Sequence, residues 1–319
     1  MIKRTLYFGN PAYLSLKDKQ LIVRLPEVEK NSQLDPLFKQ QEQATIPVED
    51  IGVVVLDHQQ ITISHGLLDA LMQNNVAVIT CNNTRHPAGL LLPLQGNTLQ
   101  HERYQSQLAA SEPLRKQLWQ QTIIQKIKNQ AALLSQQQID AGRLYPVYNN
   151  VKSGDSENAE GVAAAFYWSN IFTKIPASIE SAPGNLFRRQ RDGLPPNNYL
   201  NYGYAILRAT MARSIVAAGL LPTKGIHHHN RYNAYCLADD LMEPYRPIVD
   251  QLVIHIILKH GITDDLSKVI KADLLTIPVI DVKMDGENSP LMIATQRTAA
   301  SLVKCFAGEQ RKLTYPELS

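Results

Sequence analysis

Imidazole, carboxylate and guanidinium groups gather in one short stretch of the chain. The stretch reads Gly225-Ile-His-His-His-Asn-Arg-Tyr-Asn and continues, a few residues later, with Asp239-Asp240-Leu-Met-Glu243-Pro-Tyr-Arg-Pro. Imidazole nitrogens and carboxylate oxygens together form a metal-ligand set. An arginine beside such a set favours a substrate that carries phosphate, because guanidinium binds phosphate through paired hydrogen bonds. The stretch therefore predicts a metal site that acts on a phosphate ester.

A further carboxylate, Glu160, comes from a different part of the chain. Its segment, Ser156-Glu-Asn-Ala-Glu160-Gly-Val-Ala-Ala-Ala-Phe-Tyr-Trp, has helical periodicity, so that Glu160 shares a face with Ala163 and Tyr167. The small residues on this face allow a ligand or another helix to come close. A glutamate in the first turn of a helix often serves only the helix dipole, and this alternative stays open. Glu157 is the other candidate in the segment, and we expect it to lie in solvent.

The three consecutive histidines cannot all face the same way. In an extended segment His227 and His229 share one face, opposite to His228. We expect one of the three to be a metal ligand and the others to be free to contact phosphate. A histidine that serves only in structural hydrogen bonds is the alternative.

Asp240 and Glu243 are spaced to share one face of a helix. The same spacing fits a capping box at a helix start, and Pro244 and Pro247 fit the first turn of a helix that begins here. The two interpretations are compatible, because a helix start can also present carboxylates to a metal. We expect Asp239 to point elsewhere, into solvent.

Two carboxylates and one imidazole form a mixed oxygen and nitrogen site. Such a site suits Mn²⁺ and accepts Mg²⁺, whereas a structural zinc site more often uses cysteines or several histidines. With arginines nearby, we predict metal-assisted attack at a phosphodiester. The metal would activate the attacking oxygen and neutralise charge on the phosphate.

The composition is typical of a globular protein with two domains. The chain has 319 residues, of which 44% are hydrophobic and 19% charged. Its three cysteines lie far apart without CxxC spacing, which predicts reduced thiols, a cytoplasmic protein and no zinc ribbon. The N-terminal residues lack the apolar core of a signal peptide, and the apolar runs are too short to cross a membrane.

Positive charge is concentrated in one part of the chain. The net charge is only +3, but between Pro183 and Arg231 seven basic residues accompany one acid, a balance of +6 (7 − 1). Such a bias is commonly a solvated basic face. Beside a candidate metal site it also indicates a polyanionic partner.

The first part of the chain has the pattern of a β-sheet domain. Short alternating segments cover residues 4–8, 13–16 and 20–25, and Lys17-Asp18-Lys19 fits a hairpin turn. Further strands are expected over residues 51–56, 60–64 and 75–80, with a helix from Gly66. From His101 to Gln138 the periodicity is helical, as it is in most of the remaining chain. We predict an α+β protein, with a β-rich domain over residues 1–95 and a larger, mainly α-helical catalytic domain over residues 96–319.

The motifs, taken in order, resemble those of a known family. Glu160-Gly-x-x-Ala-x-x-Tyr, Gly225-x-x-His228 and Asp240-Leu-Met-Glu-Pro-x-Arg-Pro are similar to the signature of the CRISPR-associated integrases, the larger of the two universal spacer-acquisition proteins. Asn201-Tyr-Gly-Tyr-Ala-Ile-Leu, Ala217-Ala-Gly-Leu-Leu-Pro and an opening Leu-Tyr-Phe-Gly strand also match. The resemblance covers essentially the whole chain and is strongest to the form that accompanies type II systems.

This resemblance implies a metal-dependent DNA endonuclease and integrase with Mg²⁺ or Mn²⁺ as cofactor. Carried over by position, Glu160, His228 and Glu243 would be the catalytic residues and metal ligands, and Asp240 would support them. The register of the histidine rests on Gly225-x-x-His, which favours His228 over its two neighbours.

The resemblance also implies an assembly on double-stranded DNA. Members form homodimers through the N-terminal domain, and two dimers bind one dimer of a small partner adaptation protein to give a heterohexamer. The complex inserts a captured DNA fragment into the CRISPR array through attack of a 3′-hydroxyl on a phosphodiester. The candidate DNA-phosphate contacts are Arg188, Arg189, Arg191 and Arg246, of which Arg246 alone lies in a motif. A stand-alone metal-dependent nuclease and a non-catalytic nucleic-acid-binding protein are the alternatives.

Overall fold

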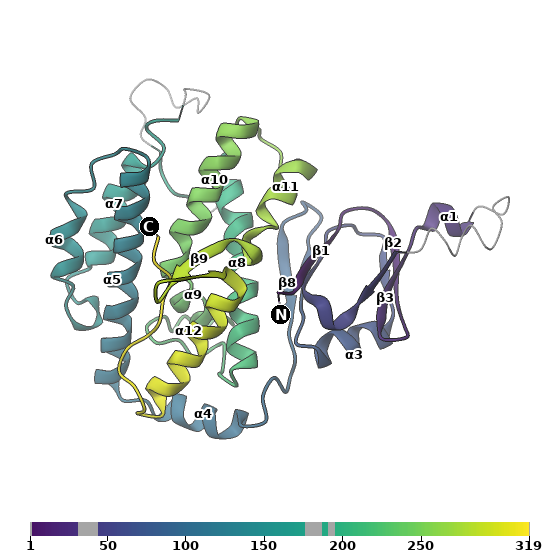
Figure 1. Cartoon of the computed structure of the whole chain (residues 1–319), viewed down its shortest axis with the longest axis horizontal. Helices are drawn as coiled ribbons and strands as arrows, with labels where there is room; N and C mark the ends of the chain where they lie inside the picture. The colour runs from purple at the N-terminus through teal and green to yellow at the C-terminus, as the bar shows by residue number, and fades with distance from the viewer. Residues whose placement is uncertain (1, 31–43, 176–186, 191–194, 319) are drawn as a thin grey trace. The chain divides into compact units, whose positions relative to one another are not determined.

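The chain divides into two compact units, residues 1–96 and residues 97–319. The computed structural model describes residues 2–30, 44–175, 187–190 and 195–318. The first unit consists mainly of strands and the second mainly of helices (Figure 1). This confirms the predicted fold class, a β-rich N-terminal part followed by a helical part.

Two four-stranded sheets form the first unit. One has the order β1-β5-β7-β8, in which β1, β5 and β7 are parallel and β8 is antiparallel to β7. The other has the order β4-β3-β2-β6, in which β3 is antiparallel to both neighbours and β6 is parallel to β2. The elements are β1 (Arg4–Phe8), β2 (Ala12–Lys17), β3 (Gln20–Arg24), α1 (Pro26–Lys30), β4 (Ala44–Pro47), η1 (Val48–Asp50), β5 (Ile51–Leu56), β6 (Ile61–Ile63), α3 (His65–Gln73), β7 (Ala77–Cys81) and β8 (Pro87–Leu91).

Local sequence explains both sheets. The run Ile51-Gly-Val-Val-Val is buried throughout, as expected for an inner strand of a parallel sheet. The predicted hairpin turn is confirmed, because Asp18 and Lys19 join β2 to β3 with φ angles of 51° and 60°. Leu14, Val54 and Leu71 belong to one buried cluster, so the two sheets and α3 share a core.

The second unit is built around three long helices. Helix α10 packs against both α5 and α8. Helix α5 also contacts α6, α7 and η3 (Figure 1). The elements are α4 (Gln100–Ala109), α5 (Glu112–Gln136), α6 (Leu144–Asn149), η2 (Ser153–Asp155), α7 (Ala159–Asn170), α8 (Asn197–Ala217), α9 (Cys236–Leu241), η3 (Glu243–Tyr245), α10 (Arg246–His260), α11 (Lys268–Leu274), η4 (Ile277–Val279), β9 (Asp281–Met284), β10 (Glu287–Pro290) and α12 (Leu291–Phe306).

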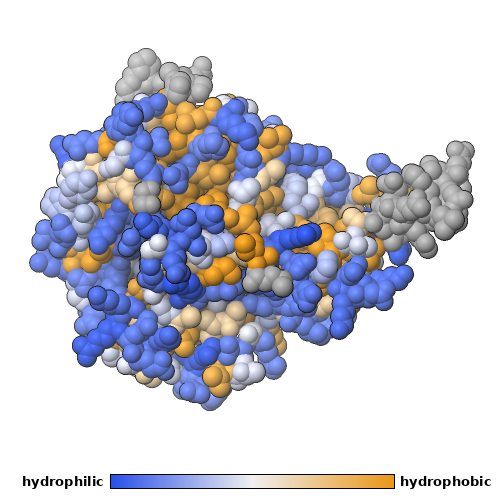
Figure 2. All heavy atoms as spheres, viewed as in Figure 1, coloured by the Kyte–Doolittle hydropathy of each residue, from blue (hydrophilic) through white to orange (hydrophobic). Residues whose placement is uncertain are grey.

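The surface is mixed in polarity. Figure 2 shows hydrophilic residues over much of the visible face, with apolar atoms gathered on the helical unit around α10. Within the described ranges, no helix combines the length and the apolar character that crossing a membrane requires.

Candidate metal centre

Helix α5 carries a buried lysine into the middle of the second unit. Ser111 caps the helix by accepting a hydrogen bond from the Leu114 amide, and Pro113 lies in the first turn. The inner face of the helix is apolar, yet Lys126 lies on it with its side chain only 10% exposed. Its Nζ is 2.5 Å from Glu160 Oε1 and 2.6 Å from Glu243 Oε2. Lys126 therefore connects two of the three predicted metal ligands.

Sequence reasoning missed Lys126, although a signal was present. The residue stands between Ile123 and Ile127 at the spacing of the buried face of a long helix. A lysine at such a position is rarely buried without partners, which points to carboxylates nearby. Burial alone would lower the pKa of Lys126, but the charges of Glu243 and Glu160 raise it. The Lys126 side chain therefore carries its proton and its positive charge at neutral pH.

Glu160 lies in the first turn of α7 but does not cap the helix. The Asp155 carboxylate accepts hydrogen bonds from the backbone amides of Ala159 and Glu160, and the Asn158 side chain accepts one from Gly161. These two residues satisfy the first amides of the helix, so the Glu160 side chain is free to reach Lys126. Glu157 is exposed, as expected.

Glu243 lies in η3 and is held from both sides. Its side chain is 6% exposed, Oε1 accepts a hydrogen bond from Arg246 Nε at 2.9 Å, and Oε2 faces Lys126. Burial would raise the pKa of Glu243, but the charges of Arg246 and Lys126 lower it to about 2. The carboxylate is ionised in any physiological buffer.

Asp240 positions the histidine loop. Its buried carboxylate accepts hydrogen bonds from the backbone amides of Ile226, at 2.6 Å, and His227, at 2.9 Å, and it pairs with Nδ1 of His228. Gly225 makes this close approach possible, because a Cβ there would lie 2.6 Å from Asp240 Oδ2 and 2.3 Å from the His228 carbonyl oxygen. The Gly225-x-x-His228 spacing thus has a steric cause.

The three histidines have different surroundings. His227 stacks on Trp119, with ring centroids 4.3 Å apart, and burial lowers its pKa. His229 is exposed, and its Nδ1 lies 3.0 Å from the carbonyl oxygen of His227. The pKa of His228 is raised, first by its hydrogen bond to Asp240 and further by the charges of Asp240, Glu243 and Glu160, against burial. His228 is the histidine that the structure joins electrostatically to the two glutamates.

Two expectations about this segment are wrong. Asp240 does not cap a helix: it lies within α9, and its carboxylate binds the histidine loop, while α10 begins only at Arg246. Asp239 is not solvated. It is 8% exposed, lies 2.6 Å from Arg208 Nε and accepts a hydrogen bond from Asn233. The adjacent prolines do occupy first turns, Pro244 in η3 and Pro247 in α10.

The donor set fits a divalent cation. Within the described ranges, no three histidine, cysteine or acidic side chains are arranged to hold a metal directly. However, Glu160 and Glu243 converge on one positive charge, the Lys126 ammonium, which is the group that faces the buried Oε2 of Glu243. His228 has one ring nitrogen held by a carboxylate, the arrangement that orients histidine ligands in metal sites.

The predicted DNA-contact arginines differ in environment. Arg246 and Arg189 both lie over the Tyr204 ring, at 4.6 Å and 5.3 Å from its centroid, and Arg189 also donates to Asn201 at 2.6 Å. Arg188 is exposed. Arg191 falls outside the described residues.

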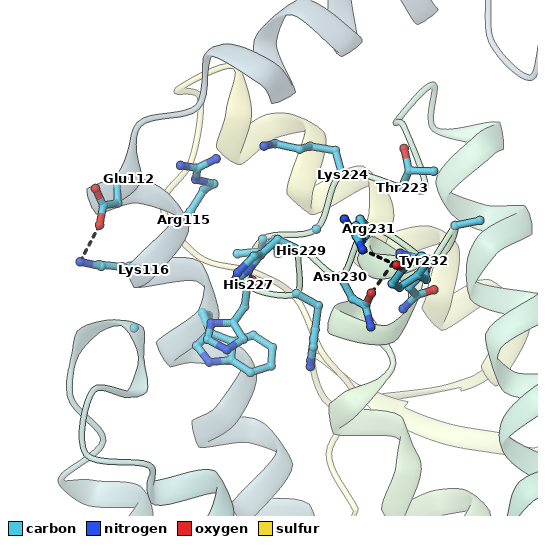
Figure 3. Close-up of a pocket in the computed structure, with 17 residues that line it drawn as sticks. Glu112, Arg115, Lys116, Thr223, Lys224, His227, His229, Asn230, Arg231 and Tyr232 are labelled. Carbon is cyan, nitrogen blue, oxygen red and sulfur yellow. Dashed lines mark hydrogen bonds and ion pairs between the residues drawn. The ribbon is translucent and has the colours of Figure 1, made fainter. Parts of the chain in front are cut away.

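A cavity of about 890 Å³ lies beside the histidine loop. Figure 3 shows Arg115 of α5 and Lys224 of the loop extending into the same space next to His227 and His229. Neither of the two cations forms an ion pair or side-chain hydrogen bond with the described part of the chain, whereas Lys116, also in the wall, pairs with Glu112 at 2.7 Å. The cavity has a surplus of positive charge.

The two-unit architecture recurs in solved structures. It matches a casposase bound to integration product with a TM-score of 0.76 and 20% identity, over 98% of this chain and 92% of that one. It also matches a CAS1 protein from Thermotoga maritima with a TM-score of 0.71 and 16% identity, over 96% of this chain and 98% of that one. These likenesses define the class of fold, one shared by casposases and Cas1 proteins.

Sequence comparison then gives the family. The protein-family model described as CRISPR associated protein Cas1 matches residues 6–276 of the chain. A relative from Neisseria meningitidis, named CRISPR-associated endonuclease Cas1, is 32% identical over 321 residues, which cover 100% of this chain and 97% of the relative. A second relative, from Pyrobaculum aerophilum, is 28% identical over 276 residues, 82% of this chain and 89% of the relative. The chain belongs to the Cas1 family, and the resemblance inferred from its motifs is confirmed.

Proposed function

We propose that the chain is a metal-dependent DNA integrase and endonuclease of CRISPR adaptation, of the form that accompanies type II systems. It inserts captured DNA fragments into the repeat array as new spacers. The observation that carries the proposal is the convergence of Glu160 and Glu243 beside His228, which Asp240 holds in place. The name of the Neisseria relative, a CRISPR-associated endonuclease, supports it.

Glu160, His228 and Glu243 would hold Mg²⁺ or Mn²⁺. When bound, the metal supplies charge neutralisation at the scissile phosphate and lowers the pKa of the attacking hydroxyl. The protein's own residues prepare this site: Asp240 fixes the orientation of the His228 ring, and Arg246 keeps Glu243 ionised. A hard cation suits carboxylate oxygens with one imidazole nitrogen.

The reaction exchanges one phosphodiester for another. The 3′-hydroxyl oxygen of the fragment forms a bond to phosphorus at the leader–repeat junction, and the existing bond from phosphorus to the 3′ oxygen of the target strand breaks. The attacking hydroxyl gives up a proton and the leaving oxygen gains one, so no external energy source is needed. A second attack at the far end of the repeat completes insertion.

DNA would approach along the basic surfaces beside the site. Arg115 and Lys224 in the cavity wall carry charges without protein partners among the described residues, and they suit backbone phosphates. Arg188, Arg189, Arg191 and Arg246 are the further candidate contacts. Arg246 lies at the site itself through its ion pair with Glu243.

The assembly is proposed by analogy. The fold matches part of a Cas6-RT-Cas1--Cas2 complex with a TM-score of 0.70, over 97% of this chain and 35% of that one. On this basis the chain would bind a small partner adaptation protein. The family resemblance extends the proposal to a cytoplasmic homodimer formed through the N-terminal unit, with two dimers and one partner dimer in a heterohexamer.

The test is a DNA-joining assay with a supercoiled target, fragments with 3′-hydroxyl ends, Mn²⁺ and the partner protein. Glu160→Ala should reduce joining at least about 100-fold while DNA binding is retained, because the site loses a ligand whose effect is exerted on the transition state. Glu157→Ala, in the same segment but exposed, is the matched control and should join normally.

The same assay separates the alternatives. Cleavage products without joined products from the wild type would favour a stand-alone nuclease that uses water. DNA binding without either product would favour a non-catalytic binding protein. Unchanged joining by Glu160→Ala would show that the ligand assignment is wrong.

A further inference from the structure

Lys126 occupies the place where the two glutamates of the proposed metal site meet. Its Nζ is within 2.6 Å of an oxygen of each, and its side chain is 10% exposed. We propose that Lys126 is an internal cation that holds Glu160 and Glu243 together before the metal binds and that the metal must displace. This inference rests on the proposed function, because it concerns the same metal site.

Charge balance supports the proposal. Without a metal, the two carboxylates of Glu160 and Glu243 are matched by two cations, Lys126 and Arg246. A buried group of charges is stable only when it is paired in this way. Counted over these four groups, a divalent cation added beside an unmoved Lys126 would leave an excess of two positive charges (+4 − 2), of which the Asp240 carboxylate, already bound to the histidine loop, could offset only one. The ammonium group therefore has to leave its position when the metal enters.

Distances lead to the same conclusion. Mg²⁺ binds oxygen ligands at about 2.0–2.1 Å. The Lys126 ammonium already lies 2.5 Å from Glu160 Oε1 and 2.6 Å from Glu243 Oε2. A metal shared by these two oxygens would overlap with the nitrogen, so the metal and the ammonium exclude each other.

The burial of the partners indicates where the exchange begins. Glu160 is 27% exposed, whereas Glu243 is 6% exposed and also held by Arg246. An incoming cation can reach the Glu160 carboxylate first. Arg246 keeps Glu243 in place during the exchange, because its ion pair does not involve Lys126. Lys126 is thus a positioning residue that raises the concentration of metal needed to load the site.

Lys126→Met tests the inference through metal binding rather than activity. The substitution keeps the apolar stem and removes the charge. In the full-length protein, calorimetric titration with Mn²⁺ alone should show at least about tenfold tighter binding than in the wild type. In EDTA the variant should melt roughly 5–15 °C lower, because the buried Glu243 and the partly buried Glu160 lose a shared cation, and Mn²⁺ should restore more of the melting temperature than in the wild type.

Lys128→Met is the matched control. Lys128 lies on the same helix, is exposed and contacts the Tyr148 ring. It should change neither Mn²⁺ affinity nor the melting temperature in EDTA. Lys126→Gln, which keeps a hydrogen-bond donor for the glutamates, provides a second variant if Lys126→Met does not fold without metal, and it should also bind Mn²⁺ more tightly.

Equal or weaker Mn²⁺ binding by both Lys126 variants would overturn the inference, because Lys126 would then support the metal instead of competing with it. Glu160→Gln separates this failure from failure of the metal site itself. If the wild type binds Mn²⁺ and Glu160→Gln does not, the site stands whatever the Lys126 variants do. If Glu160→Gln binds as well as the wild type, both the site and the inference are wrong.

Discussion

Asp240 is the residue on which the position of His228 depends. It is completely buried, and its two oxygens together receive the amides of Ile226, His227 and His228 as well as the His228 ring. These contacts fix the loop and the rotation of the imidazole at the same time. In metal sites such outer partners commonly affect affinity or activity almost as much as the ligands do.

Asp240→Asn should therefore weaken Mn²⁺ binding and DNA joining by about 10–100-fold. The amide would place an N–H donor against backbone N–H groups and would no longer attract the His228 ring as a charge does. Asp239→Asn is the matched control, since Asp239 is also buried and ion-paired, but with Arg208 rather than with the histidine loop. Calorimetry and the joining assay measure the two effects. Equal losses in the two variants would contradict a specific role for Asp240.

Residues that belong to a motif could be selected from the sequence, but the contacts between distant residues could not. Glu160, His228 and Glu243 were selected as candidate ligands because their spacing and order are distinctive. Lys126 was not found, because a lysine in a Gln- and Lys-rich helix looks solvated unless the buried face is assigned first. Asp239 was misplaced for a similar reason: its partner, Arg208, comes from another helix, and no local pattern predicts that pairing.

At the scale of elements, Asp250 joins three helices in the core of the second unit. Its carboxylate on α10 accepts hydrogen bonds from Tyr167 of α7, at 2.7 Å, and from Tyr204 of α8, at 2.5 Å. Burial raises the pKa of Asp250 to about 6, although the two tyrosine hydrogen bonds and the nearby Arg246 charge oppose the rise. Two of these helices carry Glu160 (α7) and Arg246 (α10), so the Asp250 hydrogen bonds join elements that position the site.

The raised pKa predicts how stability changes with pH. The unfolded chain loses the Asp250 proton near its ordinary pKa, whereas the folded protein retains it up to about pH 6. The contribution of Asp250 to the free energy of unfolding is therefore fully present below about pH 4 and is lost, by about 2–3 kcal/mol in total, as the pH rises from about 4 to about 6.

Urea unfolding of the wild type and Asp250→Asn between pH 4.5 and 7.5 measures this effect. The variant has no titrating group at position 250. The pH-dependent contributions of the other carboxylates are the same in both proteins and cancel in the difference between their free energies of unfolding. The wild type should lose stability relative to Asp250→Asn over this range. A difference that stays constant with pH would show that Asp250 is already ionised at the lowest pH.

Element starts were harder to predict than element types. The alternating and helical patterns located most strands and helices, because burial on one face determines them. The start of α10 was misplaced, since Asp240 and Glu243 carry the spacing of a capping box while their side chains bind other segments instead. A cap and a buried acid are identical in sequence, and only the tertiary fold distinguishes them.

At the scale of the whole molecule, the first unit shows features of an interaction surface. Strand β8 is at the edge of its sheet, a position at which a strand can pair with another chain. Leu91, at the end of β8, and Leu94, which is 90% exposed, add apolar side chains next to this edge. A sheet edge with apolar side chains next to it fits the proposed homodimer contact of the N-terminal unit.

Light scattering can test this contact on the full-length protein. The wild type should have twice the chain mass of 35.7 kDa, and the double substitution Leu91→Asp with Leu94→Asp should shift it toward 35.7 kDa, because charges would have to be buried in the interface. Leu258→Asp, at an exposed leucine of α10 in the second unit, is the matched control and should leave the mass unchanged. Dissociation by Leu258→Asp but not by the double substitution would assign the dimer contact to the helical unit. A wild type that has the mass of one chain at all concentrations would exclude the homodimer.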